Sequence, residues 1–384
     1  MDGSEWDLVI VGGGPAGTAA AAAAVGARPE LRILIVDRHD FPRDKTCGDG
    51  VAAEALDVAA ELGFAMGPLL AGCPPIDRLR LTAPGGAVAD RPMARAVRVI
   101  PRTILDARLL ADVRERGVAF RRQTVRRLTR AGDHIVLDGT IRAAMVIAAD
   151  GAESMVRRAT TAPRRRSSPV ALALRGYAAE LPGQDGAQLI TMSARNWPAY
   201  AWSFPIGDGR ANVGYGELLT DRPLNREALR AGMSRLLPGL DPEPGGLRAH
   251  RLPLSPGRPR IADGRVLLTG DALSLVNPLS GEGIFYALRS GSLAGRAAAA
   301  ALGGEVPDAG AAYRHSMDRA LRRHLRTTDR LDRVLRHPWL LDAGIRAAAA
   351  RQRTFDDLVR LALADGTLSV PLLVGIGSHL RSTV

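Results

Sequence analysis

Three glycines near the start of the chain have the spacing of a phosphate-binding turn. Gly12-x-Gly14-x-x-Gly17 lies between an apolar run, Leu8 to Val11, and an alanine-rich stretch, Thr18 to Val25. The run predicts a buried strand and the stretch predicts a helix. Gly12 would permit the tight turn, Gly14 the approach of a pyrophosphate and Gly17 close helix–strand packing. The amides at the helix start would then bind the phosphates.

An acidic residue follows at the distance expected for ribose binding. A second apolar strand, Leu31 to Val36, ends at Asp37, twenty residues after Gly17. A carboxylate at this position can accept hydrogen bonds from ribose hydroxyls. We therefore predict a dinucleotide site that includes Pro15, Ala16 and Arg38 beside the glycines and Asp37. The alternative is a structural glycine turn followed by a surface aspartate.

Composition limits the classes of function. The 384 residues suffice for two domains, and no apolar run is long enough to span a membrane. The formal net charge is +12, yet Lys45 is the only lysine and the arginines are dispersed. With 4% aromatic residues and no nucleic-acid motif, we expect no nucleic-acid binding, whereas weak attraction to acidic membrane surfaces is more plausible. Two cysteines, Cys47 and Cys73, and a charged opening without a signal peptide suggest a reducing cytoplasm.

The loop after Asp37 carries a family signature. Arg43-Asp44-Lys45-Thr46-Cys47-Gly48-Asp49-Gly50, after the glycine fingerprint, resembles the geranylgeranyl reductase family of FAD-dependent oxidoreductases. That family shares the two-domain fold of the aromatic-hydroxylase-type (group A) flavoprotein monooxygenases. The resemblance implies FAD and places Lys45, Cys47, Gly48 and Asp49 beside the flavin ring. Cys47, Gly48 and Asp49 are the candidate catalytic residues. On its own, Cys47 would be read as a small, partly buried residue.

Two further motifs occur in the order that this superfamily has. The strand at 144–148 leads to Asp150-Gly151, and the strand at 265–269 leads to Gly270-Asp271. Pro278-x-x-Gly281-Glu282-Gly283-Ile284 then begins a helix that we predict to extend to Leu302. The resemblance implies that these residues, together with Arg102, bind FAD. Asp150 could instead cap the following turn, and Arg102 could be a solvated arginine at a helix start.

Aromatic side chains gather on one predicted strand. Alternation places Tyr200, Trp202 and Phe204 on a single face, which could form a wall for an apolar ligand. Tyr215 lies in a neighbouring glycine-rich strand, and we include it among the substrate-binding candidates. Ordinary sheet core is the alternative. The family carries a similar strand along its substrate cavity, usually with glycine where this chain has Ala199.

The order of the motifs predicts the architecture. We expect an α/β fold with a Rossmann-type (glutathione-reductase-like) FAD domain, an inserted mainly antiparallel β-sheet substrate domain and a C-terminal helical segment. The expected FAD domain comprises 1–72, 100–162 and 260–305, and the substrate domain 73–99 and 163–259. A basic connector, Arg164 to Arg166, falls at 163–168, and 306–384 is helical and arginine-rich. We predict no metal site.

Three reactions fit a reduced flavin beside an apolar cavity. We favour monooxygenation of an isoprenoid- or terpenoid-derived substrate, by epoxidation or hydroxylation through a flavin C4a-hydroperoxide. The alternative is reduction of prenyl C=C bonds, with Cys47 as a conceivable proton donor. Val51-Ala52-Ala53-Glu54, where prenyl reductases commonly have Leu-Thr-Pro-Arg, and Ala199 lean away from that alternative. Halogenation is a minor alternative, because only part of a Trp-x-Trp-x-Ile-Pro strand is present. A flavin-binding sensor or scaffold is a fourth reading.

The electron source is left open by the motifs. Only one Gly-x-Gly-x-x-Gly occurs, so no second dinucleotide domain is expected. Either NAD(P)H visits the flavin transiently, or a separate reductase supplies the electrons.

Overall fold

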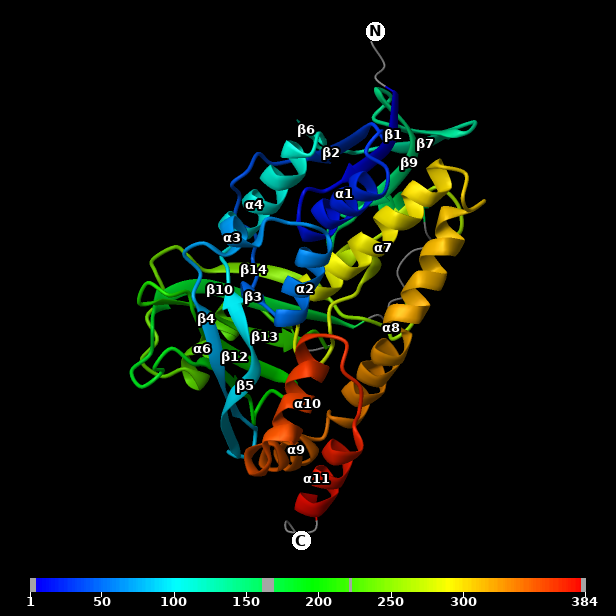
Figure 1. Ribbon diagram of the computed structural model, residues 1–384. Helices are drawn as coiled ribbons and strands as arrows, with labels where there is room; N and C mark the ends of the chain where they lie inside the picture. Colours follow the sequence, from blue (N-terminus) through cyan, green and yellow to red (C-terminus); the bar gives the residue numbers. More distant parts are fainter. Residues whose placement is uncertain (1–4, 161–168, 221–222, 381–384) are drawn as a thin grey trace.

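The computed structural model describes residues 5–160, 169–220 and 223–380 of the chain. Two sheets and a group of C-terminal helices form an elongated molecule (Figure 1). The basic connector expected at 163–168 lies outside the described residues.

The elements follow one another in chain order. The strands are β1 (Glu5–Val11), β2 (Ile33–Asp37), β3 (Gly50–Val51), β4 (Pro75–Thr82), β5 (Val88–Val99), β6 (Ala119–Arg122), β7 (Leu128–Ala131), β8 (His134–Leu137), β9 (Ile141–Ala148), β10 (Val170–Ala179), β11 (Gln188–Met192), β12 (Ala199–Pro205), β13 (Arg210–Leu218), β14 (Arg248–Pro253) and β15 (Val266–Leu268). The helices are α1 (Pro15–Ala27), α2 (Ala53–Glu61), α3 (Met66–Leu70), α4 (Arg102–Glu115), α5 (Met155–Thr160), α6 (Arg226–Leu236), α7 (Ile284–Leu302), α8 (Ala309–Val334), α9 (Pro338–Ala350), α10 (Gln352–Leu363) and α11 (Val370–Leu380), with a 3-10 turn at Gly270–Leu273.

The first sheet is centred on β1. Its strand order is β6-β2-β1-β9-β8-β7, with β15 paired to β9. β1 pairs in parallel with β2 and with β9, and β15 also runs parallel to β9. The carboxyl ends of these four strands therefore lie at one edge of the sheet, which is where ligands bind in open α/β sheets. The loops beginning at Gly12, Arg38, Ala149 and Thr269 all start from that edge.

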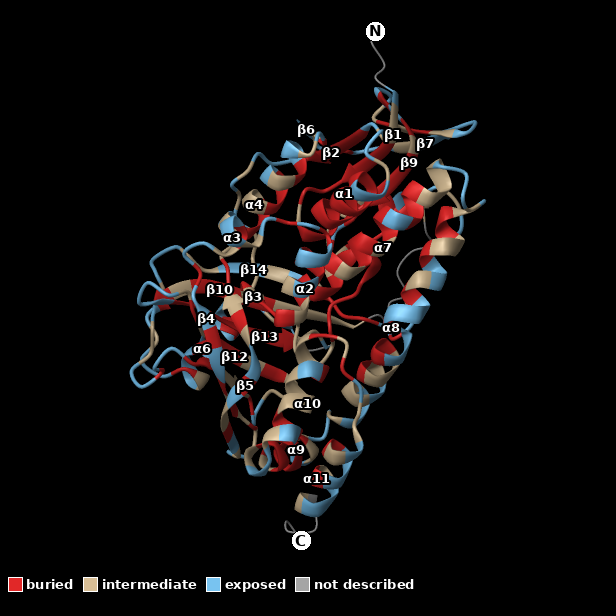
Figure 2. Cartoon of the chain, in the orientation of Figure 1, coloured by how far each residue is buried: buried red, intermediate tan, exposed pale blue. Residues whose placement is uncertain are grey.

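Helices α1 and α7 pack against each other with unusually close backbones. A Cβ built at Gly291 would lie 2.2 Å from the carbonyl oxygen of Ala16, and one at Gly295 would lie 2.2 Å from that of Ala20. Small residues on both helices allow this approach, and Figure 2 shows α1 buried along most of its length. α1 begins at Pro15 rather than at Thr18, because proline suits the first helical position.

The second sheet has the order β14-β10-β13-β12-β11-β4-β5-β3. β11 and β4 are parallel, and the other neighbours are antiparallel. The hairpin expected between residues 73 and 99 is present as β4 and β5. Helix α6 and strand β7 were not expected from the sequence. Helix α2 starts at Ala53 rather than Val51, because Gly50–Val51 pairs with β5.

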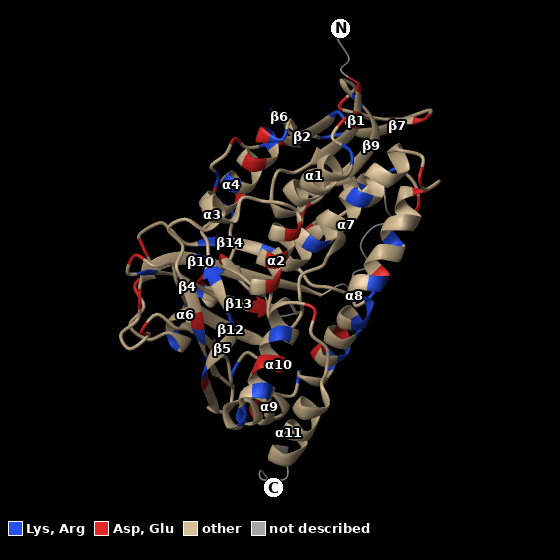
Figure 3. Cartoon of the chain, viewed as in Figure 1, with Lys and Arg blue, Asp and Glu red and all other residues tan. Residues whose placement is uncertain are grey.

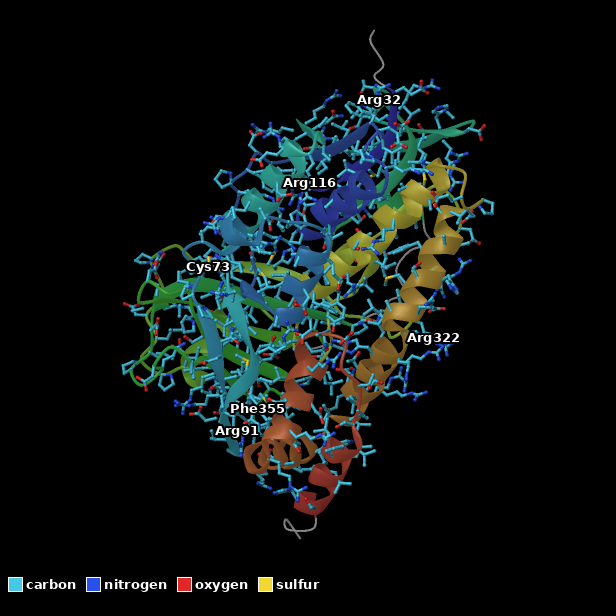
Figure 4. All side chains as sticks on the ribbon, viewed as in Figure 1. Arg32, Cys73, Arg91, Arg116, Arg322 and Phe355 are labelled. Atoms are coloured by element: carbon cyan, nitrogen blue, oxygen red, sulfur yellow. The ribbon has the colours of Figure 1, made fainter. Side chains whose placement is uncertain are left out.

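The C-terminal helices cover the end of the second sheet. The backbone amide of Gly85, in the β4–β5 turn, donates to Asp342 of α9 at 2.9 Å. Arg91 of β5 donates through Nε to the carbonyl of Ala349 at 3.0 Å, and Phe355 of α10 is fully buried beside it (Figure 4). The predicted fold class is therefore confirmed. The predicted domain boundaries remain a prediction. Among the described residues, no helix is long and apolar enough to cross a bilayer.

Candidate functional site

A large cavity of about 890 Å³ extends from the carboxyl edge of the first sheet to the C-terminal helices. Most residues that the sequence marked as candidates line it. These are Gly12, Gly14, Pro15, Ala16, Asp37, Arg38, Lys45, Cys47, Gly48, Asp49, Arg102, Asp150, Gly151, Tyr200, Trp202, Phe204, Asp271, Pro278, Gly281, Glu282, Gly283 and Ile284.

Gly17 and Gly270 lie behind the cavity wall. A Cβ at Gly17 would be 1.9 Å from the carbonyl oxygen of Gly12, so this glycine serves helix–strand packing. Gly270 has φ +53°, and its amide donates to Ser290 Oγ of α7 at 2.9 Å. Neither residue is among those that line the cavity.

Tyr215 is a correction to the sequence analysis. Its neighbours Gly214 and Gly216 lie beside Trp202, so the Tyr215 side chain leaves the opposite face of β13. There its ring packs on Gly232 of α6, and its hydroxyl donates to Glu217 Oε2 at 2.7 Å. Tyr215 therefore belongs to a core behind the sheet and does not line the cavity.

Asp37 fastens the glycine turn. Its Oδ2 accepts a hydrogen bond from the amide of Gly13 at 2.8 Å, and its Oδ1 accepts one from His39 at 3.0 Å. Each carboxylate oxygen retains a second lone pair for another donor. The position suits a ribose, as expected.

Two arginines share one buried carboxylate beside Gly14. Arg102 donates to both oxygens of Asp106, at 2.6 and 2.7 Å, and Arg43 Nη1 lies 3.0 Å from Asp106 Oδ2. A Cβ at Gly14 would lie 3.4 Å from Arg43 Nη2 and 3.6 Å from Arg102 Nη2. The cluster therefore carries one net positive charge next to the predicted pyrophosphate position. The sequence analysis found Arg102 but missed Arg43 and Asp106.

The loop that carries Cys47 is held by side chains of the second sheet. Arg175 of β10 donates to the carbonyls of Cys47 and Lys45, at 3.1 and 2.9 Å, and to Asp44 Oδ1 at 2.5 Å. Asn212 of β13 donates to the carbonyl of Cys47 at 2.9 Å. The Arg175 guanidinium is almost completely buried, so its charge-assisted hydrogen bonds hold the loop in one conformation.

Asp49 is the buried acid of this loop. It has φ +60°, and its Oδ2 accepts from Tyr177 at 2.6 Å and from Asn212 at 2.7 Å. Burial raises its pKa to about 6, although the Arg175 charge and both hydrogen bonds lower it. Its Oδ1 has no hydrogen-bond partner among the described residues. Sequence reasoning missed Arg175, Tyr177 and Asn212, because no motif contains them.

The thiol of Cys47 lies at the cavity wall beside the same loop. Burial raises its pKa, while the nearby Arg102 charge acts in the opposite direction. The thiol is therefore protonated at neutral pH. Gly48 follows it, and a Cβ there would lie 3.5 Å from the Phe204 ring and 3.6 Å from Trp202 Nε1.

An ion pair connects this loop to the turn after β15. Lys45 Nζ is 3.2 Å from Asp271 Oδ2, and His250 of β14 also lines the cavity. Burial and then the Lys45 charge lower the pKa of His250 to about 4, so its ring is neutral at pH 7. Its Nε2 is buried without a partner among the described residues. His250 was not singled out in the sequence.

Asp150 shows the capping role that was left open. Its Oδ2 accepts from the amides of Met155 and Val156, at 2.8 and 3.2 Å, at the start of α5. Its Oδ1 is buried and has no partner among the described residues. One oxygen thus caps the helix, and the other is available to a ligand in the cavity.

The segment before α7 forms another wall. Glu282 Oε1 accepts from the amide of Phe285 at 2.8 Å, and burial raises the pKa of Glu282 to about 7. The Tyr200 hydroxyl donates to the carbonyl of Ser280 at 2.5 Å, which ties the aromatic strand β12 to this segment. The three aromatic rings form a continuous row, with centroids 5.9 Å apart for Tyr200–Trp202 and 6.4 Å for Trp202–Phe204.

The far end of the cavity is apolar. Ile190 and Met192 of β11, Leu341 and Ile345 of α9 and Leu358 of α10 contribute to its lining. Trp197 Nε1 donates to the carbonyl of Leu335 at 2.6 Å, which holds the α8–α9 corner against this end.

A buried polar latch connects the C-terminal helices to the segment before α7. Asn277 Nδ2 donates to the carbonyl of Ala362 at 3.0 Å and to the hydroxyl of Tyr286 at 2.9 Å. That hydroxyl lies 2.7 Å from His324 Nε2, and His324 Nδ1 lies 2.6 Å from the carbonyl of Gly366. The latch joins α7, α8 and the end of α10.

The residues present fit FAD. A glycine turn and an arginine pair suit a pyrophosphate, and Asp37 suits a ribose. Three buried polar atoms have no hydrogen-bond partner among the described residues: Asp49 Oδ1, Asp150 Oδ1 and His250 Nε2. The polar ring system or the polyol chain of FAD would form hydrogen bonds with them. No group of three or more potential metal ligands occurs in the described part of the chain.

Comparison with known proteins gives a consistent result. The sequence matches the lycopene cyclase protein family over residues 7–364. It is 34% identical over 315 residues to the menaquinone reductase of Mycolicibacterium smegmatis, covering 75% of each chain. It is 29% identical over 324 residues to digeranylgeranylglycerophospholipid reductase 1 of Methanothermobacter thermautotrophicus, covering 78% of each. The crystal structure of a geranylgeranyl bacteriochlorophyll reductase-like protein from Thermoplasma acidophilum superposes with a TM-score of 0.80 at 19% identity, covering 99% of this chain and 100% of that one.

Proposed function

The chain belongs to the geranylgeranyl reductase family of FAD-dependent oxidoreductases, within the lycopene cyclase protein family, and from this premise we propose that it reduces a carbon–carbon double bond in the prenyl chain of a lipid. The reductases among its relatives support an FAD-dependent oxidoreductase. The substrate class and the reaction are our proposal.

The observation that carries the proposal is the continuity of the cavity. One end is lined by Gly14, Asp37 and Arg102, and the other by apolar side chains of β11, α9 and α10. The Cys47 loop lies between the two ends. A flavin at the first end would therefore meet an extended hydrocarbon chain at the second.

The residues of the chain have distinct roles in this reaction. Arg43 and Arg102 would hold the phosphates, and the aromatic row would exclude water and orient the chain. Bound, reduced FAD would supply a hydride, and the double bond would gain that hydride and one proton to become a single bond. The protonated Cys47 Sγ at the cavity wall is the proposed proton donor, and Asp49 behind it holds the loop.

The relatives support reduction more than the monooxygenation that the sequence analysis favoured. Both sequence relatives described above are named reductases. The changes at Val51–Glu54 and Ala199 do not outweigh this. Ala199 lies in the core behind the second sheet, and of the other four residues only Val51 and Ala52 line the cavity, where neither is a reacting group. We propose that the electrons for this reduction come either from NAD(P)H directly or from a separate reductase.

The test compares products under two atmospheres. The purified holoenzyme is reduced with dithionite without oxygen and mixed with menaquinone or with a digeranylgeranyl glycerophospholipid. The quinone ring is reoxidised in air before mass spectrometry, so only hydrogens added to the chain are counted. We expect products with two additional hydrogen atoms per reduced bond, and none from oxidised enzyme. A product that gains oxygen in air, without anaerobic hydrogenation, would establish the monooxygenase instead.

The electron donor is tested separately. NADPH or NADH is added to the oxidised enzyme, and bleaching of the flavin absorbance is followed with and without substrate. Rapid unassisted bleaching means that the nicotinamide reacts directly. Bleaching only after addition of a flavin reductase means that a partner is needed.

A further inference from the structure

Helix α8 carries a row of arginines on one face. Arg319, Arg322, Arg326, Arg330 and Arg333 follow one another at intervals of three or four residues, so they lie along one side of the helix. We call this row the arginine stripe. Figure 3 shows basic residues along the outer side of α8, and Figure 4 shows Arg322 pointing away from the molecule.

The stripe is largely without internal counter-charge. Within the described ranges, Arg319, Arg322 and Arg330 form no ion pair, and only Arg333 pairs, with Asp329 at 2.7 Å. Partial burial, followed by the charges of Arg258 and Arg322, lowers the pKa of Arg326. The guanidinium groups therefore repel one another, and an external anionic surface would relieve that repulsion.

Apolar side chains are exposed immediately beyond the stripe. Val334 at the end of α8 is 49% exposed and Trp339 at the start of α9 is 55% exposed. On α11, which packs against α9, Val370, Leu373 and Val374 are 73%, 52% and 58% exposed. We call these five residues the apolar corner. They are five of the six large apolar side chains that are exposed among the described residues, so exposed apolar surface is concentrated on the C-terminal helices.

The apolar corner adjoins the hydrocarbon end of the cavity. Asp332, Leu335 and Arg336, which surround Val334 in sequence, line the cavity, as does Leu341 just after Trp339. Val334 and Trp339 are therefore exposed on a corner whose inner side faces the proposed binding place of the prenyl chain. The prenyl chain of a lipid lies in the apolar interior of a membrane, so it would reach this end of the cavity from the membrane side.

We propose that the arginine stripe and the apolar corner dock the protein on an anionic lipid bilayer. The stripe would contact the headgroups, and Trp339 with the α11 side chains would enter the interface. The inference deepens the proposed function, because docking would bring the end of the cavity to the lipid. Binding is measured without turnover, so its result is independent of whether the reductase proposal holds.

The first test is flotation of the holoenzyme with vesicles. We expect flotation with phosphatidylcholine vesicles that contain phosphatidylglycerol, and little with phosphatidylcholine alone. Arg319→Glu/Arg322→Glu/Arg330→Glu should weaken binding about a hundredfold, since each basic residue contributes about a fivefold factor near an anionic surface.

A matched variant separates the surface from net charge. Arg121→Glu/Arg127→Glu/Arg130→Glu makes the same charge change at exposed positions of β6, β7 and the segment between them, at the opposite end of the molecule from α9 and α11 in Figure 1. It should float as the wild type does. Flavin absorbance and circular dichroism verify that both variants are folded. Equal loss in both variants, or no flotation of the wild type, would overturn the proposal.

The second test locates the contact. Brominated phospholipids quench tryptophan that enters the bilayer, and we expect quenching on vesicle addition that disappears in Trp339→Phe. Quenching that persists in this variant would place the contact elsewhere. Tighter binding of an acidic protein or duplex DNA than of anionic vesicles would also contradict the proposal.

Discussion

At the scale of single residues, Asp49 is the most informative group. A buried acid whose pKa is raised from 3.8 to about 6 binds its proton more tightly in the folded protein than in the unfolded chain. Its stabilising contribution is present below pH 4 and is lost as the pH rises through 6. The shift corresponds to about 3 kcal/mol.

Asp49→Asn should remove this dependence. An amide oxygen can still accept from Tyr177 and Asn212, but the side chain no longer titrates. We expect the free energy of unfolding of the wild type, relative to the variant, to fall by about 3 kcal/mol between pH 4 and pH 7 in urea titrations. Asp133→Asn, at a side chain that is 92% exposed, should follow the wild type. A wild-type–variant difference that is identical at both pH values would contradict this assignment.

Arg175 gives the second residue-scale prediction. Arg175→Met removes the donor to Asp44 Oδ1 and to the carbonyls of Cys47 and Lys45, while Asn212 still donates to Cys47 and Arg248 still pairs with Asp44. We expect a loss of about 1–3 kcal/mol in the free energy of unfolding and weaker FAD retention. Arg175→Lys should restore part of the loss, because an ammonium cannot reach all three oxygens as a guanidinium does. Unfolding titrations and flavin content after gel filtration measure both effects. If Arg175→Met has the unfolding free energy and flavin content of the wild type, Arg175 does not hold the Cys47 loop in place.

At the scale of elements, the close approach of α1 and α7 is the sensitive feature. Gly295→Ala would place a Cβ 2.2 Å from the carbonyl oxygen of Ala20, so the helices must separate. We expect destabilisation of about 1–3 kcal/mol. Gly26→Ala, in α1 with nothing near its Cβ, should instead stabilise by about 0.4–1 kcal/mol. The midpoint temperatures of thermal unfolding should therefore shift in opposite directions for the two variants, relative to the wild type. A shift in the same direction for both would exclude helix packing as the cause.

The elements also show what could be predicted from the sequence. Gly12–Gly17, Asp150 and Asp271 belong to local strand–turn signatures, so their neighbourhood at one sheet edge could be derived from motif order alone. Arg175, Tyr177 and Asn212 could not be found, because their contact with the Cys47 loop depends on long-range strand register, in which Tyr177 lies opposite Asn212. Tyr215 was misplaced for a related reason. The sequence of its glycine-rich strand does not reveal which face of β13 lies against Trp202. In the structure Gly214 and Gly216 lie on that face, so Tyr215 lies on the other.

At the scale of the whole molecule, the cavity joins parts that are distant in sequence. Its cofactor end comes from the first sheet and its apolar end from β11, α9 and α10. The length of the apolar end should therefore limit the hydrocarbon chain that fits, independently of the cofactor.

Leu358→Trp tests this separation. A larger side chain in the apolar end should lower kcat/KM for long prenyl chains by about tenfold or more, while short ones are less affected and flavin content is unchanged. Val88→Trp, at an exposed position of β5 outside the cavity, should leave the chain-length preference as it is. An equal loss of kcat/KM for all chain lengths would show that Leu358 does not determine the chain length that the cavity accepts.

The latch at Asn277, Tyr286 and His324 has a consequence for biosynthesis. Its acceptors are carbonyls of residues 361–366, which follow α7 and α8 in the chain. During translation, the segment before α7 emerges from the ribosome well before those carbonyls do. The walls that α9 and α10 give to the cavity can therefore form only after every strand of both sheets has been made.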